Sequence, residues 1–279
     1  MGQSKRNTAQ FLLENPWCIF CGGSTPATSL EHCPPRALFV DRAWPEGFEF
    51  PACAACNGGS SDEDLLVAFL GHIDPDPTST RNPSPTWLGL MKNVRRQVPG
   101  FLQGMRIESA TEVRRAARRM GVKPLPGQTY RDLPFFNVPP ELTEAVQTFA
   151  GKLTRATYFM ETREVFPREG GILFHWFTNA SRVDENGVPI ALATFVPLAA
   201  KQPELTRNGK DLSDQFALRV SLGEQDGDRL FVLQTMFRRT FGFVCVAATR
   251  PGQAEGMLAE ATASAGTATG PFVLLPALP

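Results

Sequence analysis

The sequence predicts an α+β protein in which a small cysteine-rich N-terminal module is followed by a larger domain of helices and antiparallel strands. Five of the six cysteines lie within the first 56 of 279 residues. Apolar residues then recur with helical spacing through the middle of the chain. Beyond residue 170, short runs rich in β-branched and aromatic residues are typical of strands.

Length and charge set limits on the class of protein. The length suits one large domain or two modest ones. Net charge is zero, yet residues 1–75 carry 4 basic and 9 acidic side chains, whereas residues 92–123 carry 9 basic and 2 acidic. If the protein binds nucleic acid, residues 92–123 are therefore the more favourable segment for that contact. No run of 18 apolar residues and no signal peptide is found, so we expect a cytoplasmic protein without membrane contact.

The chain divides into four expected segments. These are a module over 1–75, a proline-rich linker over 76–90, an α+β domain of unknown role over 91–250, and an Ala/Gly/Thr-rich tail over 251–279. The stretch "GGSSDEDLLVAFLGH" predicts a helix that begins with a capping box of Ser60 and Glu63. The linker is predicted from "IDPDPTSTRNPSPTW", which is rich in turn-forming residues.

Two helices are predicted in the middle of the chain. The first has a capping box of Ser109 and Glu112 and a C-cap at Gly121. Its outer face carries four arginines that could contact DNA phosphates or form a solvated amphipathic face: Arg114, Arg115, Arg118 and Arg119. A longer helix begins near "PPELTEAV" and buries an apolar stripe from Leu142 to Met160.

The last third of the chain predicts an antiparallel sheet packed on the long helix. The candidate strands are "GILFHWF", "IALATFVPL", "QFALRVSL", "RLFVLQTMF" and "FGFVCVAAT". We expect the tail to be loosely held until "FVLLP", which could dock as an edge strand.

Two Cys-x-x-Cys pairs predict a structural zinc site. "CIFC" and "CAAC" are separated by 31 residues and supply Cys18, Cys21, Cys53 and Cys56. Four thiolates from two tight turns form the tetrahedral shell that Zn²⁺ prefers. The alternative is a set of unrelated redox or buried thiols. Cys33 and Cys245 have no partner by spacing and are expected to be small buried residues.

A zinc ion with four cysteine ligands has no open position, so catalysis would need other residues. Glu31 and His32 lie between the two cysteine pairs, and Asn57 directly follows the second pair. An imidazole can take a proton from water near neutral pH. Carboxylate and amide oxygens suit Mg²⁺, which would offset charge at a phosphodiester.

At "EHCPP" and "CAACN" the sequence resembles the HNH endonucleases, over about residues 16–72. The resemblance implies a ββα-metal, treble-clef-like core with a four-cysteine zinc site and hydrolysis of DNA phosphodiester bonds. It also implies that His32 is the general base and that Glu31 and Asn57 hold catalytic Mg²⁺ or Mn²⁺. Two features depart from the pattern. "WPEGFEFPAC" has no asparagine before the second pair, and "NGGSSDED" has no basic residue to position phosphate.

Each candidate residue also has a structural alternative. His32 could be a buried hydrogen-bonded histidine, and Asn57 could be a left-handed turn residue. Glu63 is either an additional metal ligand or only part of the capping box, and Asp62 is more simply a first-turn acid. Arg36 could contact phosphate or lie at the surface. His72 and His175 are expected to be structural.

Two rival functions remain open at the sequence level. The zinc module could be a non-catalytic unit that binds nucleic acid or protein, with the activity in the larger domain. Alternatively, the protein could be the nuclease of a bacterial defence or mobile-element assembly, activated by a protein partner that docks on the C-terminal domain. The "EH" and "CN" pairs favour the nuclease, whereas the acidity of residues 1–75 favours the binding module.

Overall fold

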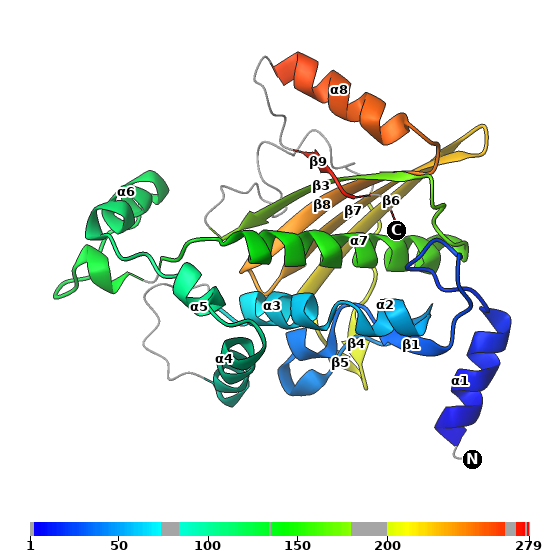
Figure 1. The fold of residues 1–279 in the computed structure, drawn as a ribbon, viewed down its shortest axis with the longest axis horizontal. Helices are drawn as coiled ribbons and strands as arrows, with labels where there is room; N and C mark the ends of the chain where they lie inside the picture. The colour runs from blue at the N-terminus through cyan, green and yellow to red at the C-terminus, as the bar shows by residue number, and fades with distance from the viewer. Residues whose placement is uncertain are drawn as a thin grey trace.

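The computed structural model describes residues 3–73, 84–133, 135–179, 200–265, 272–276 and 278, and confirms the α+β class. Its centre is a five-stranded antiparallel sheet of order β6-β7-β8-β3-β9. The strands are β3 (Gly171–Thr178), β6 (Phe216–Gln225), β7 (Asp228–Phe237), β8 (Phe241–Ala248) and β9 (Val273–Leu274). Helix α7 (Pro140–Thr162) crosses one face of this sheet and α8 (Gln253–Ala265) lies over the other (Figure 1).

The N-terminal module contains a small hairpin followed by short helices. After α1 (Gln3–Glu14), strand β1 (Ser29–His32) pairs antiparallel with β2 (Glu49–Ala52), and His32 lies opposite Glu49. Two 3₁₀ turns, η1 (Arg36–Leu38) and η2 (Val40–Arg42), lie between the strands. Helices α2 (Ala54–Gly58) and α3 (Ser61–Gly71) follow β2. The order β1, β2, α2 is a ββα unit.

The region expected to be a linker is partly helical. Residues 74–83 lie outside the described residues, but α4 (Pro85–Gln97) begins within the expected linker. Ser84 caps this helix by accepting a hydrogen bond from the Trp87 amide at 3.1 Å, and Pro85 occupies the first turn, where proline is tolerated. Trp87 stacks on Phe69 of α3 with ring centroids 4.7 Å apart. The Ser-Pro signal therefore marks a helix start.

The arginine helix forms as expected and lies far from the hairpin. After α5 (Phe101–Gly104), helix α6 (Ala110–Met120) is capped by Ser109, and Gly121 adopts the left-handed conformation. A further 3₁₀ turn, η3 (Tyr130–Asp132), follows α6 and contributes to its small separate core. Met120 is 37% exposed, so the apolar face of α6 is shorter than predicted. In Figure 1, α6 lies at the opposite end of the long axis from β1.

Helix α7 is buried around most of its circumference, which its apolar stripe alone did not predict. The stripe from Leu142 to Ala156 is buried, and Met160 is half-buried. Polar residues on other faces are buried too, because the helix lies between the sheet and α3: Lys152, Thr154, Arg155 and Thr157. The two threonine hydroxyls donate to backbone carbonyls four residues earlier. One contiguous core joins the cysteine module, α7 and the sheet.

The C-terminal third confirms most of the predicted strands and corrects the tail. "GILFHWF", "QFALRVSL", "RLFVLQTMF" and "FGFVCVAAT" fall in β3, β6, β7 and β8, whereas "IALATFVPL" lies outside the described residues. "FVLLP" contributes the edge strand β9. Residues 253–265 of the expected loose tail form α8, whose alanines favour a helix. Met257 and Leu258 of α8 pack on the sheet face opposite α7.

A two-stranded hairpin links the C-terminal region to the N-terminal module. Strands β4 (Thr206–Arg207) and β5 (Lys210–Asp211) are joined by Asn208 and Gly209, both at positive φ. This Asn-Gly pair suits the tight turns of hairpins. Glu46 anchors the hairpin, since its amide donates to the Thr206 carbonyl at 2.9 Å and its carboxylate accepts from the Asn208 amide at 2.8 Å.

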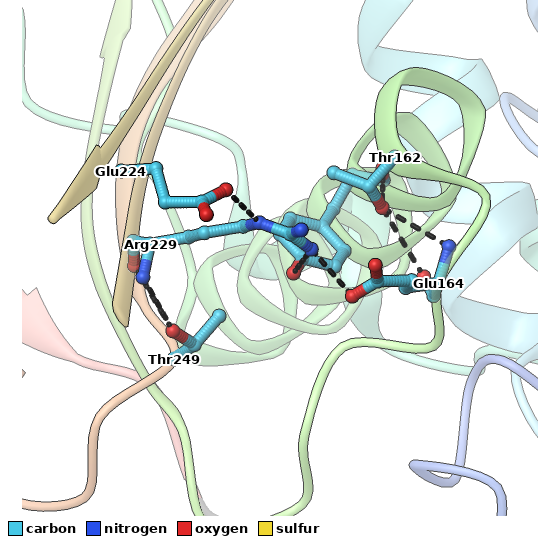
Figure 2. Close-up of polar contacts among 6 residues, drawn as sticks. Thr162, Glu164, Glu224, Arg229 and Thr249 are labelled. Carbon is cyan, nitrogen blue, oxygen red and sulfur yellow. Dashed lines mark hydrogen bonds and ion pairs between the residues drawn. The ribbon is translucent and has the colours of Figure 1, made fainter. Parts of the chain in front are cut away.

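Arg229 ties the sheet to the end of α7. Figure 2 shows its guanidinium between Glu224 and Glu164, with Nε donating to Glu224 at 2.8 Å. The guanidinium also contacts the Tyr158 hydroxyl at 3.3 Å, and the Arg229 amide donates to Thr249 Oγ1 at 2.7 Å. The bond to Glu164, with those to Glu224 and Tyr158, raises the pKa of Arg229, so it stays charged.

Candidate metal centre and histidine site

Four cysteines form a cluster that could hold a metal ion such as zinc. The Sγ atoms of Cys18, Cys21, Cys53 and Cys56 all lie within 4.8 Å of one another. Four sulfurs at the Zn–S distance of about 2.3 Å around a tetrahedral ion would be separated by about 3.8 Å, so the cluster fits this geometry. Gly22 and Gly23 follow the first pair at φ 65° and 76°, which permits the tight turn.

Four of the six thiols belong to the cluster and two lie outside it. Within the cluster, the hydrogen bond between Cys56 and Cys18 lowers the pKa of Cys18 to about 4, which favours the thiolate that metals bind, and raises the pKa of Cys56. Burial raises the pKa of Cys33 well above its usual range and that of Cys245 to about 12. These two cysteines are buried thiols outside the cluster, in agreement with the sequence prediction.

Glu31 points into a buried polar cluster and forms an ion pair with Lys152 of α7. Only 5% of Glu31 and 9% of Lys152 are exposed. The Lys152 ammonium also donates to Ser60 Oγ at 2.7 Å and lies 3.8 Å from an oxygen of Asp64. One buried ammonium thus lies close to two carboxylates and a hydroxyl. We call Glu31, Ser60, Asp64 and Lys152 the Lys152 cluster.

The two acids of the Lys152 cluster share a single positive charge. Burial raises the pKa of Glu31 and of Asp64, and the shared ammonium offsets this effect only in part. Burial also works against the charge of Lys152, but the carboxylates of Asp64 and Glu31 outweigh it and raise its pKa. Lys152 is therefore a charged ammonium buried between helices α3 and α7 and strand β1.

Ser60 and Asn57 have structural contacts on the same side of β1. Ser60 stands at the N-cap position of α3 but makes no side-chain cap, so the predicted capping box with Glu63 does not form. Its hydroxyl instead donates to Asp64 at 3.3 Å and accepts from Lys152. Asn57 is helical, not left-handed, and its amide nitrogen donates to Ser29 Oγ at 2.8 Å and to the Leu30 carbonyl at 3.3 Å. Asn57 therefore fixes α2 to β1.

His32 lies in a different environment. Its Nε2 is 3.1 Å from Oε1 of Glu49, and its ring stands edge-on to Trp44 with centroids 4.6 Å apart. The side chain is 28% exposed, so water reaches it. Burial lowers the pKa of His32, while Glu49 raises it and the nearby charges of Arg36 and Arg207 lower it further. The net shift is downward, so His32 is a neutral imidazole at pH 7.

The structure separates the three predicted catalytic residues into two groups. Successive side chains of a strand point to opposite faces, so Glu31 and His32 face opposite ways. Glu31 shares its face with Ser29, which accepts a hydrogen bond from Asn57. The Glu31 carboxylate is paired with Lys152, and the Asn57 side-chain amide is bonded to Ser29. His32 shares the other face with Glu49, its cross-strand neighbour. The histidine and the proposed metal-binding pair therefore do not form one compact cluster.

Glu49 and Arg207 were not identified from the sequence. Glu49 belongs to "FEFPAC", and pairing that segment with "SLEH" would have placed it opposite His32. Arg207 had no local signal, because it reaches the module from a hairpin 175 residues after His32. Glu49 also lines an open cavity of about 770 Å³ between α1, the β1–β2 hairpin and the end of α7, with Phe11, Leu30 and Arg163.

The other predicted residues lie outside this site. All four arginines of α6 are exposed, and the Arg114 guanidinium lies 5.5 Å from the ring of Tyr130. His72 contacts the Ala37 carbonyl through Nε2 at 3.1 Å, and its Nδ1 accepts from Arg238 at 3.2 Å. These bonds give it a structural role. Glu63 is half-buried in the first turn of α3, where the helix dipole favours an acid.

No protein-family model matches this sequence, and searches of curated proteins and of solved structures find no match. The resemblance to the HNH endonucleases therefore rests on the residues themselves. Among the described residues, no helix combines the length and apolar character needed to cross a membrane.

Proposed function

We propose that the N-terminal module hydrolyses phosphodiester bonds in DNA, with His32 as the general base. The observation that carries the proposal is the pairing of the partly exposed, neutral imidazole of His32 with the carboxylate of Glu49. A histidine oriented by a carboxylate and open to water is an arrangement suited to general-base catalysis. The four-cysteine cluster and the ββα order around it agree with the resemblance to HNH endonucleases.

The proposed step uses both nitrogens of the imidazole. With the proton assigned to Nε2 from its contact with Glu49, Nδ1 carries the lone pair. Nδ1 takes a proton from water, the water oxygen attacks phosphorus, and the bond from phosphorus to the leaving deoxyribose oxygen breaks. Glu49 then stabilises the imidazolium, and the leaving oxygen takes a proton from solvent. DNA is chosen over RNA on the family resemblance alone.

The predicted catalytic Mg²⁺ or Mn²⁺ does not fit the arrangement of Glu31 and Asn57. The Glu31 carboxylate is already paired with Lys152, and the Asn57 amide braces β1. An additional cation there would meet the Lys152 ammonium. The need for a divalent metal remains a prediction for experiment, and the proposed step does not pass through it. The four-cysteine site would hold zinc as a structural ion, which suits a cytoplasmic protein with reduced thiols.

A second candidate is a non-catalytic zinc module that binds nucleic acid or protein. The closed Lys152 cluster favours it, because the residues that would hold the catalytic metal serve to join β1 to α7. The exposed arginines of α6 would then contact phosphates away from His32. In either case, a protein partner that binds the C-terminal domain, as in a defence assembly, would activate the protein.

Cleavage of supercoiled plasmid tests the proposal. Purified protein is incubated with Mg²⁺ or Mn²⁺ or with EDTA, beside His32→Ala and Glu49→Gln variants, and zinc content is measured throughout. General-base catalysis contributes roughly 100-fold or more, so we expect His32→Ala to lose cleavage by at least that factor. Glu49→Gln should retain part of the activity. His175→Ala, which changes a histidine of β3 outside the module, is the matched control and should cut normally.

Two outcomes would contradict the proposal. Equal cleavage by the wild type and by His32→Ala would remove His32 from the chemistry. DNA binding without cleavage, by a folded zinc-loaded protein in every metal condition, would favour the binding module.

A further inference from the structure

Two arginines meet at one tryptophan beside His32. The guanidinium carbon of Arg36 lies 4.1 Å from the Trp44 ring centroid, and that of Arg207 lies 4.0 Å from it. Arg36 belongs to η1 of the module, whereas Arg207 belongs to β4 of the C-terminal hairpin. His32 contacts the same ring. Segments far apart in the sequence therefore bring two positive charges and an indole to the face of β1 that carries His32.

This group contains buried donors without acceptors. Arg36 Nε and Trp44 Nε1 are both buried and have no hydrogen-bond partner among the described residues. A buried N–H group that lacks an acceptor is unfavourable, and neighbouring examples point to an acceptor that comes from outside the chain. Trp44 is only 9% exposed, and its indole nitrogen is fully buried.

The two guanidinium groups of this site lack a directly paired acid. Among the described ion pairs, none includes Arg36 or Arg207. Glu46 and Glu49 lie in the same region, but the carboxylate of Glu46 accepts from the Asn208 amide and that of Glu49 contacts His32, and neither is within ion-pair distance of an arginine of this group. Both arginines lower the pKa of His32, which places their charges within electrostatic reach of the imidazole. Two guanidinium groups without a directly paired carboxylate keep donors that an anion can accept from.

We propose that Arg36, Trp44 and Arg207 form a binding site for a phosphate group of a nucleic-acid backbone. Guanidinium donors match phosphate oxygens in geometry and charge, and the cation–π contacts with the indole hold both arginines beside one ring. Glu46 hydrogen-bonds to the backbone on both sides of Arg207, which fixes the position of this residue relative to the module. The site supplies the phosphate contact that the residues after Asn57 lack. That the phosphate bound here is the one that is cleaved rests on the proposed function.

Binding is tested on the intact, zinc-loaded protein by NMR of ¹⁵N-labelled tryptophan indoles. The ligands are inorganic phosphate and a short single-stranded thymidine oligonucleotide without terminal phosphates, and the Trp44→Phe variant identifies the Trp44 signal. We expect both ligands to shift this signal and to leave that of Trp176, in β3, in place. Arg207→Gln and Arg36→Gln should each weaken binding roughly tenfold, the loss expected for one charge-assisted contact. Lys210→Gln, exposed on the same hairpin, is the matched control.

The outcomes separate the site from the catalytic proposal. A Trp44 signal that neither ligand moves, or wild-type affinity in Arg207→Gln, overturns the phosphate site even if the plasmid is cut. Binding of inorganic phosphate but not of the oligonucleotide overturns the assignment to a nucleic-acid backbone. Binding of both ligands by a protein that never cuts DNA supports the site and contradicts the proposed hydrolysis.

Discussion

Removing the ammonium of Lys152 should destabilise the whole protein. The Lys152→Met variant keeps a long apolar side chain in the helix but leaves Glu31, which is 5% exposed, without its cation. Asp64 loses its nearby positive charge, and Ser60 loses a donor. Breaking one side of a buried ion pair typically costs about 3–5 kcal/mol, and we expect the free energy of unfolding to fall by about that much.

Denaturant unfolding at neutral pH with excess zinc measures this loss. Lys201→Met is the matched control, because the Lys201 side chain is 65% exposed and its pair with Glu161 should contribute less than about 1 kcal/mol. The loss in Lys152→Met should shrink as pH falls. The folded-state pKa of Glu31 is already raised by burial and rises further without Lys152, so protonation below that pKa removes the buried charge.

A double variant tests whether the lost stability comes from the unpaired buried charge. In Glu31→Gln/Lys152→Met both charges are absent, and neutral replacements of buried pairs are often tolerated. The double variant should therefore be clearly more stable than Lys152→Met. If Lys152→Met loses less than about 1 kcal/mol, or if the double variant is as unstable as the single one, the Lys152 cluster is not the buried ion pair described above.

Two further predictions concern the metal centre and the shared core. Cys56→Ser should abolish stoichiometric zinc binding, measured by elemental analysis, because it removes one of four clustered sulfurs, whereas Cys245→Ala, outside the cluster, should keep it. Leu153→Ala, at a fully buried position of α7, should lower stability by about 2–5 kcal/mol. Zinc release and loss of near-ultraviolet circular dichroism should then shift together on heating, and separate shifts would contradict a single core joining the module and the sheet.

Features with a strong local signal were predictable from the sequence. Cysteine spacing indicated the metal cluster, and apolar runs located β3, β6, β7 and β8. The caps of α6 depend on residues within a few positions of its ends, so Ser109 and Gly121 sufficed to place them. Such signals act through neighbours along the chain and need no knowledge of the fold.

Long-range packing decided the features that the sequence did not reveal. The direction and partner of Glu31 depend on Lys152, 121 residues away, and no local pattern links the two. Ser60 had the signal of a helix cap, but its hydroxyl bonds to that same lysine and to Asp64. Arg207 joins the His32 face only because its hairpin is anchored by Glu46. In each case a tertiary contact outweighed or replaced the local preference.

The position of α7 has a consequence for how the chain matures during synthesis. Residues 3–73 leave the ribosome before residues 140–162, which contain the lysine that pairs with Glu31 and form the helix that covers α3. Until α7 emerges, the nascent module exposes apolar side chains and Glu31 lacks its cation, so the core of the module cannot form fully. The module therefore reaches its final form only after residues 140–162 have been translated.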